Sequence, residues 1–237
     1  MTTKRQPLRT VNNVTYLRLP QKTKIITTGD DIVELTDRYT HQVRQKGDLI
    51  VVAESPTAIS QGRAIPEKDI RIGLLARLLW RGVRKVPYGI GLRSPATMQC
   101  AINEAGALRI LAAGVVGLFG KLMGRRGDFY RVAGMQVSVI DAAHTSPIEP
   151  YDQCVILGPK DPDGVTDRIT KRTGCEAAIM DINDIGGSRV LGATKGIDRP
   201  LLEEIMCDNP MGQNDECTPI TLVRKVREEP PTGSRKG

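Results

Sequence analysis

Two aspartates in this chain each follow a short apolar run. Asp141 comes directly after residues 137–140, and Asp181 comes directly after residues 177–180. Such runs are typical of buried strands, so both carboxylates are expected at strand ends. Two carboxylates that converge from neighbouring strand ends form a natural Mg²⁺ or Mn²⁺ site, because these hard cations take oxygen ligands and share substrate phosphates. For each aspartate alone, a cap on the turn that closes its strand is the competing interpretation.

Polar and glycine residues follow each aspartate. Asp184, Gly186 and Gly187 come soon after Asp181, and glycine allows the backbone to approach a phosphate closely. Asp184 itself is interpreted as structural. His144 lies three residues after Asp141 and could either donate to a phosphate oxygen or cap its own turn. A metal–phosphate site of this kind would act on a transferring phosphoryl group by positioning and charge neutralisation.

Several other kinds of site are excluded by what the sequence does not contain. It has no G-x-x-x-x-G-K-[ST] motif, no nucleophile elbow and no C-x-x-C pair. Only two histidines are present, so a histidine-based metal centre or catalytic dyad is disfavoured. Cys154 falls within a predicted strand and is interpreted as a core residue. The five cysteines favour a reducing compartment.

Composition places the chain among ordinary globular proteins with a positive surface. It has 237 residues, a formal net charge of +7 and only 3% aromatic residues. The charge suits phosphorylated ligands, nucleic acid or anionic lipid, and the scarcity of aromatics disfavours binding of single-stranded nucleic acid by stacking. The sequence does not begin with an apolar segment. The most apolar stretch, residues 105–123, contains the charged residues Arg109 and Lys121. We therefore expect a cytoplasmic protein without a transmembrane segment.

Helical and strand patterns alternate along the chain. A helix is expected to begin at residues 28–31, with Ile32, Leu35, Tyr39 and Val43 on one face. A second helix is expected at 165–172, stopped by Gly174, and a third near 200–207. Strands are expected at residues 49–53, 137–140, 154–157, 176–181, 189–193 and 219–223.

Three further segments have distinctive compositions. Residues 1–22 are basic and are expected to form a mobile or docking arm, and 227–237 a disordered tail. Residues 69–86 are expected to form an amphipathic helix whose basic face is either solvated surface or a site for an anionic partner. Residues 101–124 could form one glycine-rich helix that admits a second subunit, or break into shorter pieces.

Seven motifs, taken in order, resemble the gamma-glutamyl ligase family of the deazaflavin coenzyme F-420. No single motif decides the resemblance, which rests on their order and covers roughly residues 23–65 and 137–225. The motifs lie at residues 28–35, 47–53, 61–63, 140–141, 160–163, 179–181 and 211–214.

The resemblance implies a GTP-dependent ligase that joins an activated carboxylate to the amine of L-glutamate, with an α+β fold that forms a homodimer. By position, Asp141 and Asp181 resemble the ligands of the Mn²⁺ or Mg²⁺ ion. Lys24, Ile25 and Ile26 would line the nucleotide together with Ser55, and His144 falls where the family has an asparagine that contacts the nucleotide. No residue is assigned as catalytic.

Some positions depart from the family pattern. Ser55 and Ile59 fall where the family usually places lysines for the phosphates, and Ile182 stands where the family tends to have a polar residue. The chain also lacks a segment between Gly196 and Pro200 that supplies nucleotide and metal contacts in the family. Loss of two ammonium groups should weaken nucleotide binding.

The sequence thus predicts an α+β fold with mixed sheets and packed helices, as an intertwined homodimer. Residues 23–226 would form the ligase-like domain, with 66–134 as a divergent helical, glycine-rich insert. The first hypothesis is a nucleotide- and metal-dependent amide ligase. The second is a non-catalytic relative that binds a phosphorylated ligand or a protein partner. A third is a nucleic-acid or anionic-membrane binder that uses the basic residues of the N-terminal arm and of residues 77–85.

Overall fold

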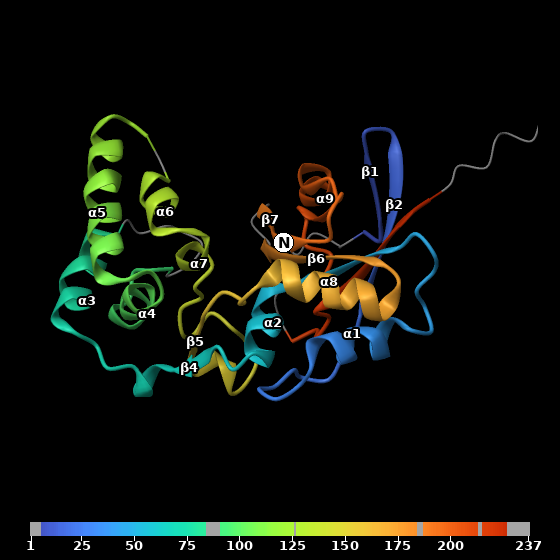
Figure 1. The fold of residues 1–237 in the computed structure, drawn as a ribbon, viewed down its shortest axis with the longest axis horizontal. Helices are drawn as coiled ribbons and strands as arrows, with labels where there is room; N and C mark the ends of the chain where they lie inside the picture. The colour runs from blue at the N-terminus through green and yellow to red at the C-terminus, as the bar shows by residue number, and fades with distance from the viewer. Residues whose placement is uncertain (1–5, 84–90, 126, 184–186, 213–214, 227–237) are drawn as a thin grey trace, which may run out of the picture.

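A computed structural model describes residues 6–83, 91–125, 127–183, 187–212 and 215–226 (Figure 1). Its larger part, here called the sheet lobe, is a six-stranded mixed sheet with helices on both faces. The strand order is β1-β2-β8-β3-β6-β7, with β3 and β6 parallel and every other pair antiparallel. The strands are β1 (Leu8–Val11), β2 (Val14–Gln21), β3 (Leu49–Ala53), β6 (Glu176–Asn183), β7 (Gly187–Ala193) and β8 (Ile220–Lys225).

The central strands are apolar on both faces, which explains why they appear in the sequence as unbroken apolar runs. In β3, Ile50 and Val52 point to one core, while Val51, between them, points to the other. In β6, Ile179 and Met180 divide between the same two cores. This alternation is the two-residue period of a strand, and it requires a covering layer on each side of the sheet.

Three helices supply these layers. On one face, α1 (Ile32–Thr40) and α8 (Pro162–Thr173) pack against the sheet through residues such as Leu35 and Ile169. On the other face, α9 (Arg199–Met206) contributes Leu202, Ile205 and Met206. The predicted start of α1 is confirmed by the Asp31 cap, and Gly174 ends α8 in a left-handed conformation as predicted. Two bounds differ from the prediction: α1 ends at Thr40, so Val43 lies outside it, and α8 begins at Pro162 rather than at residue 165.

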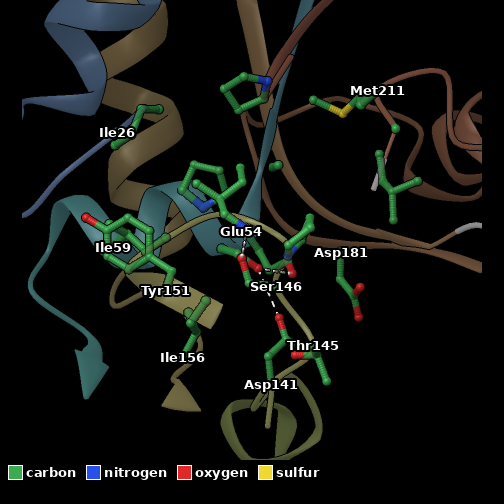
Figure 2. A pocket seen from close by; sticks show the side chains of 18 of the residues that line it. Ile26, Glu54, Ile59, Asp141, Thr145, Ser146, Tyr151, Ile156, Asp181 and Met211 are labelled. Carbon is green, nitrogen blue, oxygen red and sulfur yellow. Dashed lines mark hydrogen bonds between the residues drawn. The ribbon is translucent and has the colours of Figure 1, made fainter. Parts of the chain in front are cut away.

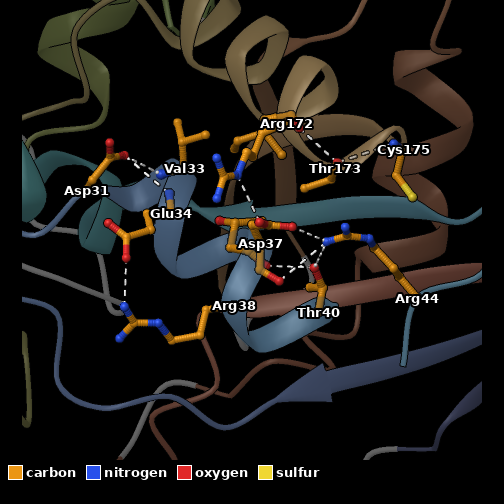
Figure 3. A network of polar contacts seen from close by, with 12 residues as sticks. Asp31, Val33, Glu34, Asp37, Arg38, Thr40, Arg44, Arg172, Thr173 and Cys175 are labelled. Carbon is orange, nitrogen blue, oxygen red and sulfur yellow. Dashed lines mark hydrogen bonds and ion pairs between the residues drawn. The ribbon is translucent and has the colours of Figure 1, made fainter. Parts of the chain in front are cut away.

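Charge pairs join the two helices on the first face. Asp37 of α1 accepts from Arg44 at 2.6 Å and from Arg172 of α8 at 2.9 Å (Figure 3). Hydrogen bonds from Arg44 and then from Arg172 lower the pKa of Asp37. The carboxylate therefore stays ionised and holds α1 beside α8.

Close approach of α8 to β7 depends on one glycine. A Cβ atom built on Gly192 would lie 2.4 Å from the carbonyl carbon of Pro162 and 2.6 Å from the amide nitrogen of Asp163. Both atoms belong to the backbone and cannot move aside. The first turn of α8 therefore rests directly on the β7 backbone.

The segment that we expected to be an N-terminal arm instead forms an edge of the sheet, because residues 8–21 are β1 and β2. Arg18 of β2 is 1% exposed and donates to the carboxylate of Asp208 and to the carbonyl oxygen of Ile205. The basic residues of this segment therefore include one that forms a buried ion pair as well as others that lie on the surface. Composition alone could not distinguish a docking arm from a strand with one internal arginine.

A second part of the molecule, here called the helical lobe, comprises α3 to α7 within residues 74–138. Figure 1 shows it at the end of the molecule away from the sheet, with β4 and β5 between the two lobes. Its core contains Met98, Ile110 and Val137, among other residues. Its helices are α3 (Leu74–Leu79), α4 (Pro95–Ala105), α5 (Ala107–Leu122), α6 (Asp128–Ala133) and α7 (Met135–Ser138), with η2 (Trp80–Gly82) after α3.

The remaining elements are short and lie in the segments that connect the two lobes. A short antiparallel pair is formed by β4 and β5, and α2 follows β3. Their bounds are α2 (Glu54–Ser60), β4 (Ala64–Pro66), η1 (Glu67–Asp69), η3 (Tyr151–Gln153) and β5 (Cys154–Ile156).

Two of the sequence predictions for this region are wrong. Residues 69–86 do not form one amphipathic helix, because Gly73 starts α3 and Gly82 closes the short η2; Arg84 and Lys85 lie outside the described residues. Residues 137–140 are not a strand. Val137 lies in α7, while Asp141 forms only an isolated bridge with Ile156.

Residues 101–124 break into two helices, which was one of the two expectations. The break lies at Gly106 (φ 85°), and α4 and α5 are bent by 113° there. Across the described residues no single helix is long and apolar enough to cross a membrane, and this bent pair meets the criteria only in combination.

Two glycines of α5, Gly117 and Gly120, admit a neighbour from the same chain. A Cβ on Gly117 would lie 3.0 Å from Cβ of Phe129, and one on Gly120 would lie 2.2 Å from Oδ2 of Asp128. Both contacted residues belong to α6. The close approach that we expected for a second subunit is thus made by α6.

The architecture confirms the α+β class with a mixed sheet and packed helices. The five cysteines are free thiols, and Cys154 is buried in β5 as predicted. Asp184 and residues 227–237, on which we made predictions, lie outside the described residues.

Candidate functional site

A pocket of about 730 Å³ lies where β3 and β6 end (Figure 2). The two strands are parallel and in register, with Ala53 opposite Met180. Glu54 directly follows β3, and Asp181, which directly follows Met180, lies within β6 opposite Arg189 of β7; both therefore reach the same edge of the sheet. Ligands of α/β proteins commonly bind at this edge, beyond the carboxyl ends of parallel strands. The volume is within the range of small-molecule sites.

Asp141 enters the pocket from the chain that follows the helical lobe. Its backbone is held by two hydrogen bonds to Ile156 of β5, at 2.8 and 3.0 Å. Its carboxylate Oδ2 lies 3.1 Å from the hydroxyl oxygen of Ser55, which also lies 2.8 Å from Oε1 of Glu54. One serine hydroxyl thus connects carboxylates from two different parts of the fold.

Three carboxylates share this end of the pocket. Burial raises the pKa of Asp141 to about 6, and the charge of Asp181 adds to the shift. Burial also raises the pKa of Glu54 well above its usual range, with further contributions from the charges of Asp181 and Asp141. The pKa of Asp181 is raised by burial as well, against the opposing charge of Arg189. Like charges held together in this way favour a bound cation or a bound proton.

The donor set fits a divalent cation held by two carboxylates rather than a closed protein cage. No group of three or more His, Cys, Asp or Glu side chains within the described ranges is arranged to hold a metal ion. Asp141 and Asp181 could still share one Mg²⁺ or Mn²⁺, since such ions keep waters and substrate phosphates as their other ligands. Burial raises the pKa of both carboxyls, and the charge of Asp181 adds to the shift of Asp141, a repulsion that such an ion would relieve.

The opposite wall of the pocket comes from the segment between β2 and α1. Lys24, Ile25 and Ile26 line the pocket there, while Ser55 of α2 lines it beside Asp141. Lys24 forms an ion pair of 2.5 Å with Asp30 in the turn that starts α1, and its backbone amide donates to the hydroxyl of Tyr39. These contacts hold the segment in place, and Ile26 also packs in the core with Ile32 of α1.

Comparison with protein families gives one match, to F420-0:gamma-glutamyl ligase, over residues 21–194. The chain belongs to the F420-0:gamma-glutamyl ligase family. The match spans both lobes and includes the pocket residues named above. No individual curated protein matches significantly.

Six of the seven residues predicted by resemblance to the gamma-glutamyl ligases line this one pocket. His144 is the exception, because it has a left-handed backbone (φ 66°) and a side chain that is 66% exposed. Its Nε2 lies 3.6 Å from Glu67, and Thr145 and Ser146 line the pocket instead.

Glu54 is a pocket residue that the sequence reasoning missed although a signal was present. The rule that selected Asp181, a carboxylate directly after an apolar strand, applies equally to Glu54 after residues 49–53. Thr145 and Ser146 carried no such signal, because which side chain of a polar turn faces inward depends on its backbone conformation.

Cations are scarce in this ligase-family pocket. Among the described residues that line it, Lys24 is the sole Lys or Arg, whereas Glu54, Asp141, Asp181 and Glu216 are acidic. Ser55 and Ile59 occupy the two positions where lysines were expected, and Ile59 is buried. A polyphosphate would meet repulsion here unless a cation accompanied it.

Proposed function

We propose that this member of the gamma-glutamyl ligase family is a nucleotide- and divalent-metal-dependent ligase. It would form an amide bond between an activated carboxylate and glutamate or a similar amino acid. The observation that carries the proposal is the meeting of Asp141 and Asp181 in one pocket of about 730 Å³ at the sheet edge. The Lys24–Ile26 segment faces that pocket from the other side.

The proposed reaction has two balanced steps. A carboxylate oxygen of the first substrate attacks the γ-phosphorus of GTP, and the bond between that phosphorus and the leaving GDP oxygen breaks. The amine nitrogen of the amino acid then attacks the acyl carbon, loses a proton and displaces inorganic phosphate. Most of the catalytic work in such phosphoryl transfer is positioning and charge stabilisation.

In this reaction the chain itself would bind and orient the substrates. Residues 24–26 would line the nucleotide, and the hydroxyl of Ser55 would keep Asp141 oriented. Asp141 and Asp181 would hold the Mg²⁺ or Mn²⁺ ion, which neutralises charge on the nucleotide phosphates when bound. With Lys24 already paired to Asp30, this metal charge would be essential for phosphate binding.

Calorimetric titration of GTP and ATP, each with and without Mn²⁺, tests the proposal. We expect heat of binding only when nucleotide and metal are both present, and its loss in Asp181→Asn. Asp167→Asn is the matched control, because Asp167 is an exposed carboxylate on α8. Absence of nucleotide binding in the presence of metal would contradict the proposal.

A non-catalytic relative is the second candidate, and the scarcity of pocket cations favours it. This candidate predicts retained binding of a phosphorylated ligand without glutamate-dependent release of phosphate. Phosphate release with glutamate and a set of carboxylate acceptors, followed by mass spectrometry of the products, separates the two candidates.

Restoring a cation gives a complementary test. Ser55→Lys places an ammonium group where the family usually has one, and should strengthen binding of the GTP–metal complex by about tenfold. Ser60→Lys, outside the pocket lining at the end of α2, is the control for added charge. An equal gain from both variants would show that general electrostatic attraction is responsible.

The homodimer implied by the resemblance stays a prediction. Light scattering of the purified chain across a range of concentrations measures it directly.

A further inference from the structure

We propose that the helical lobe docks onto an anionic lipid surface through the outer face of α5. This inference concerns a face remote from the pocket and does not depend on the proposed ligase activity. It starts from the exposure of this helix, which is apolar around most of its circumference.

Most apolar side chains of α5 face outward. The exposed fractions of Leu108, Phe119 and Leu122 are 84%, 61% and 76%, and Leu111, Val115 and Leu118 are exposed as well. Only a narrow stripe containing Ile110, Ala113 and Gly120 is buried, against the other helices of the lobe. A helix that is apolar all round normally lies in a core or in lipid.

The exposed face is broad rather than a single seam. Leu108, Leu111, Val115, Leu118 and Leu122 recur at three- and four-residue spacing, and Val116 and Phe119 widen the same surface. At the same end of the molecule, Leu74 and Leu78 of α3 are 80% and 67% exposed. Exposed apolar surface of this extent marks an interaction site.

Positive charge accompanies this apolar surface. Residues 74–138 contain ten Arg and Lys and two acids, Glu104 and Asp128, so this segment has a net charge of +8 while the whole chain has +7. Lys121 lies at the end of α5, and Arg77 lies on α3; both are exposed. Apolar side chains combined with long basic ones are typical of helices that lie at the headgroup boundary of anionic bilayers.

The dimensions of α5 favour lying on a bilayer over crossing it. Its 16 residues span about 24 Å, less than the hydrocarbon core of about 30 Å. The 113° bend at Gly106 prevents α4 from extending the same axis. The helix could therefore insert one face between headgroups and leave the lobe outside.

Charge favours a lipid surface over a second copy of this chain as the occupant. Two helical lobes brought face to face would oppose two segments of net charge +8 within about a Debye length of 10 Å. The C-terminal residues 227–237 contain no large apolar side chain and are unsuited to cover the face. An anionic bilayer satisfies both the apolar and the positive character of the lobe.

Vesicle co-sedimentation of the full chain tests the proposal. Vesicles of phosphatidylcholine alone are compared with vesicles that also contain phosphatidylglycerol, at low and high salt. Trp80, the single tryptophan of the chain, lies between α3 and α4 in the same lobe and reports insertion through its fluorescence. We expect binding to the anionic vesicles, a blue shift of the Trp80 emission, and weakening at high salt.

Variants separate the apolar and the charged contributions. Leu118→Ser with Leu122→Ser should reduce partitioning by about tenfold or more. Arg77→Gln with Lys121→Gln should reduce it less and flatten its salt dependence. Leu8→Ser with Val43→Ser is the matched control, because both residues are exposed in the sheet lobe. Circular dichroism and thermal unfolding verify that each variant is folded.

Three results would overturn the proposal. One is no sedimentation with either vesicle type. Another is equal binding to neutral and anionic vesicles without salt dependence. The third is a dimer in analytical ultracentrifugation that Leu118→Ser with Leu122→Ser dissociates while vesicles do not bind, which would assign the face to a second copy.

Discussion

In the sheet lobe, Arg18 and Asp48 are buried and ion-paired, whereas most of the described cations of the helical lobe are exposed, as are many of its leucines. Arg18 pairs with Asp208, and Asp48, which is buried, pairs with Arg224 at 2.8 Å. In the helical lobe the buried Asp128 is paired with Arg125 and Arg131, yet that segment has only two acids for ten cations. Apolar residues follow the same contrast, since α1 and α8 bury theirs and α5 exposes most of its own.

The two lobes therefore bury their apolar and charged side chains in different ways. The apolar side chains of the sheet lobe are covered by its own helices, which form one layer on each face of the sheet. The helical lobe is packed internally along the α5–α6 contact but leaves an outer face that only another surface can cover. Stability measurements should therefore respond to internal contacts in both lobes, and binding measurements to the outer face of one.

The largest expected effect is loss of the buried arginine of the sheet lobe. Arg18→Ala leaves Asp208 partly buried without its main partner and should lower the free energy of unfolding by about 3–5 kcal/mol. Urea unfolding measures this change. Arg38→Ala removes an exposed partner of Glu34 and should cost less than about 1 kcal/mol. Similar losses in both variants would remove the distinction between internal and surface pairs.

A matched pair of glycine substitutions examines the internal packing of the helical lobe. Gly120→Ala places a methyl group 2.2 Å from the ion-paired carboxylate of Asp128 and should destabilise the chain by about 1–3 kcal/mol. Gly114→Ala in the same helix meets nothing within 4 Å and should stabilise it by up to about 1 kcal/mol. Thermal unfolding of both variants measures whether each substitution raises or lowers the stability. Absence of a loss in Gly120→Ala would mean that α5 does not pack against α6 as described.

At the boundary between the lobes, the carboxylates of the pocket should oppose folding at neutral pH. The pKa of Asp141 is raised from 3.8 to about 6, so the folded chain binds more protons than the unfolded chain between these values. Stability contributed by this group is therefore lost as pH rises through that window. Asp141→Asn should stabilise the metal-free chain by about 1–2 kcal/mol near neutral pH and by little near pH 4.

Urea unfolding at several pH values tests this dependence, with Asp167→Asn as an exposed control. Added Mn²⁺ should stabilise the wild-type chain more than Asp141→Asn. A variant less stable than the wild type at neutral pH without metal would contradict the repulsion inferred for the pocket.

The smallest effect is expected at the surface network of the sheet lobe. Asp37→Ala removes contacts to Arg44 and Arg172 and should cost about 1 kcal/mol. Because the pKa of Asp37 is lowered, this contribution should be present at neutral pH and fade as acid protonates the carboxylate. The free energies of unfolding of the wild type and Asp37→Ala are compared at neutral and at acidic pH. A difference that does not change with pH would show that the ion pairs contribute nothing.

Prediction from sequence succeeded where a segment contained its own boundaries. The helix expected at residues 165–172 ends before Gly174 as predicted, although it begins earlier, at Pro162 after the capping Asp161, and β3 is an apolar run between polar turns. Both signals are local, so no distant contact was needed to interpret them.

Prediction failed where tertiary contacts decide the outcome. Residues 137–140 are too few to distinguish the period of a strand from that of a helix. Val137 packs in the helical lobe, while Val139 packs in the core of the sheet lobe. The bend at Gly106 and the inward position of Glu54 likewise depend on what lies beside them.

The candidate site was predicted in part. Asp141 and Asp181 were selected as strand-end carboxylates, and the structure brings both to one pocket, although Asp141 follows no strand and Asp181 lies within β6. Resemblance supplied Lys24, Ile25, Ile26 and Ser55, which no local pattern would have selected. His144 was placed by position in the motif, and its left-handed backbone directs the side chain outward.

Gly192 gives a criterion for recognising chains with this architecture. Any side chain at that position would collide with the backbone of Pro162 and Asp163. A sequence that aligns here without glycine must therefore set its equivalent of α8 further from its equivalent of β7. Such a shift would also move the Asp163 carboxylate away from the Ala193 amide, to which it lies 3.0 Å. The presence or absence of glycine at this position thus indicates whether a relative can share this contact between helix and strand.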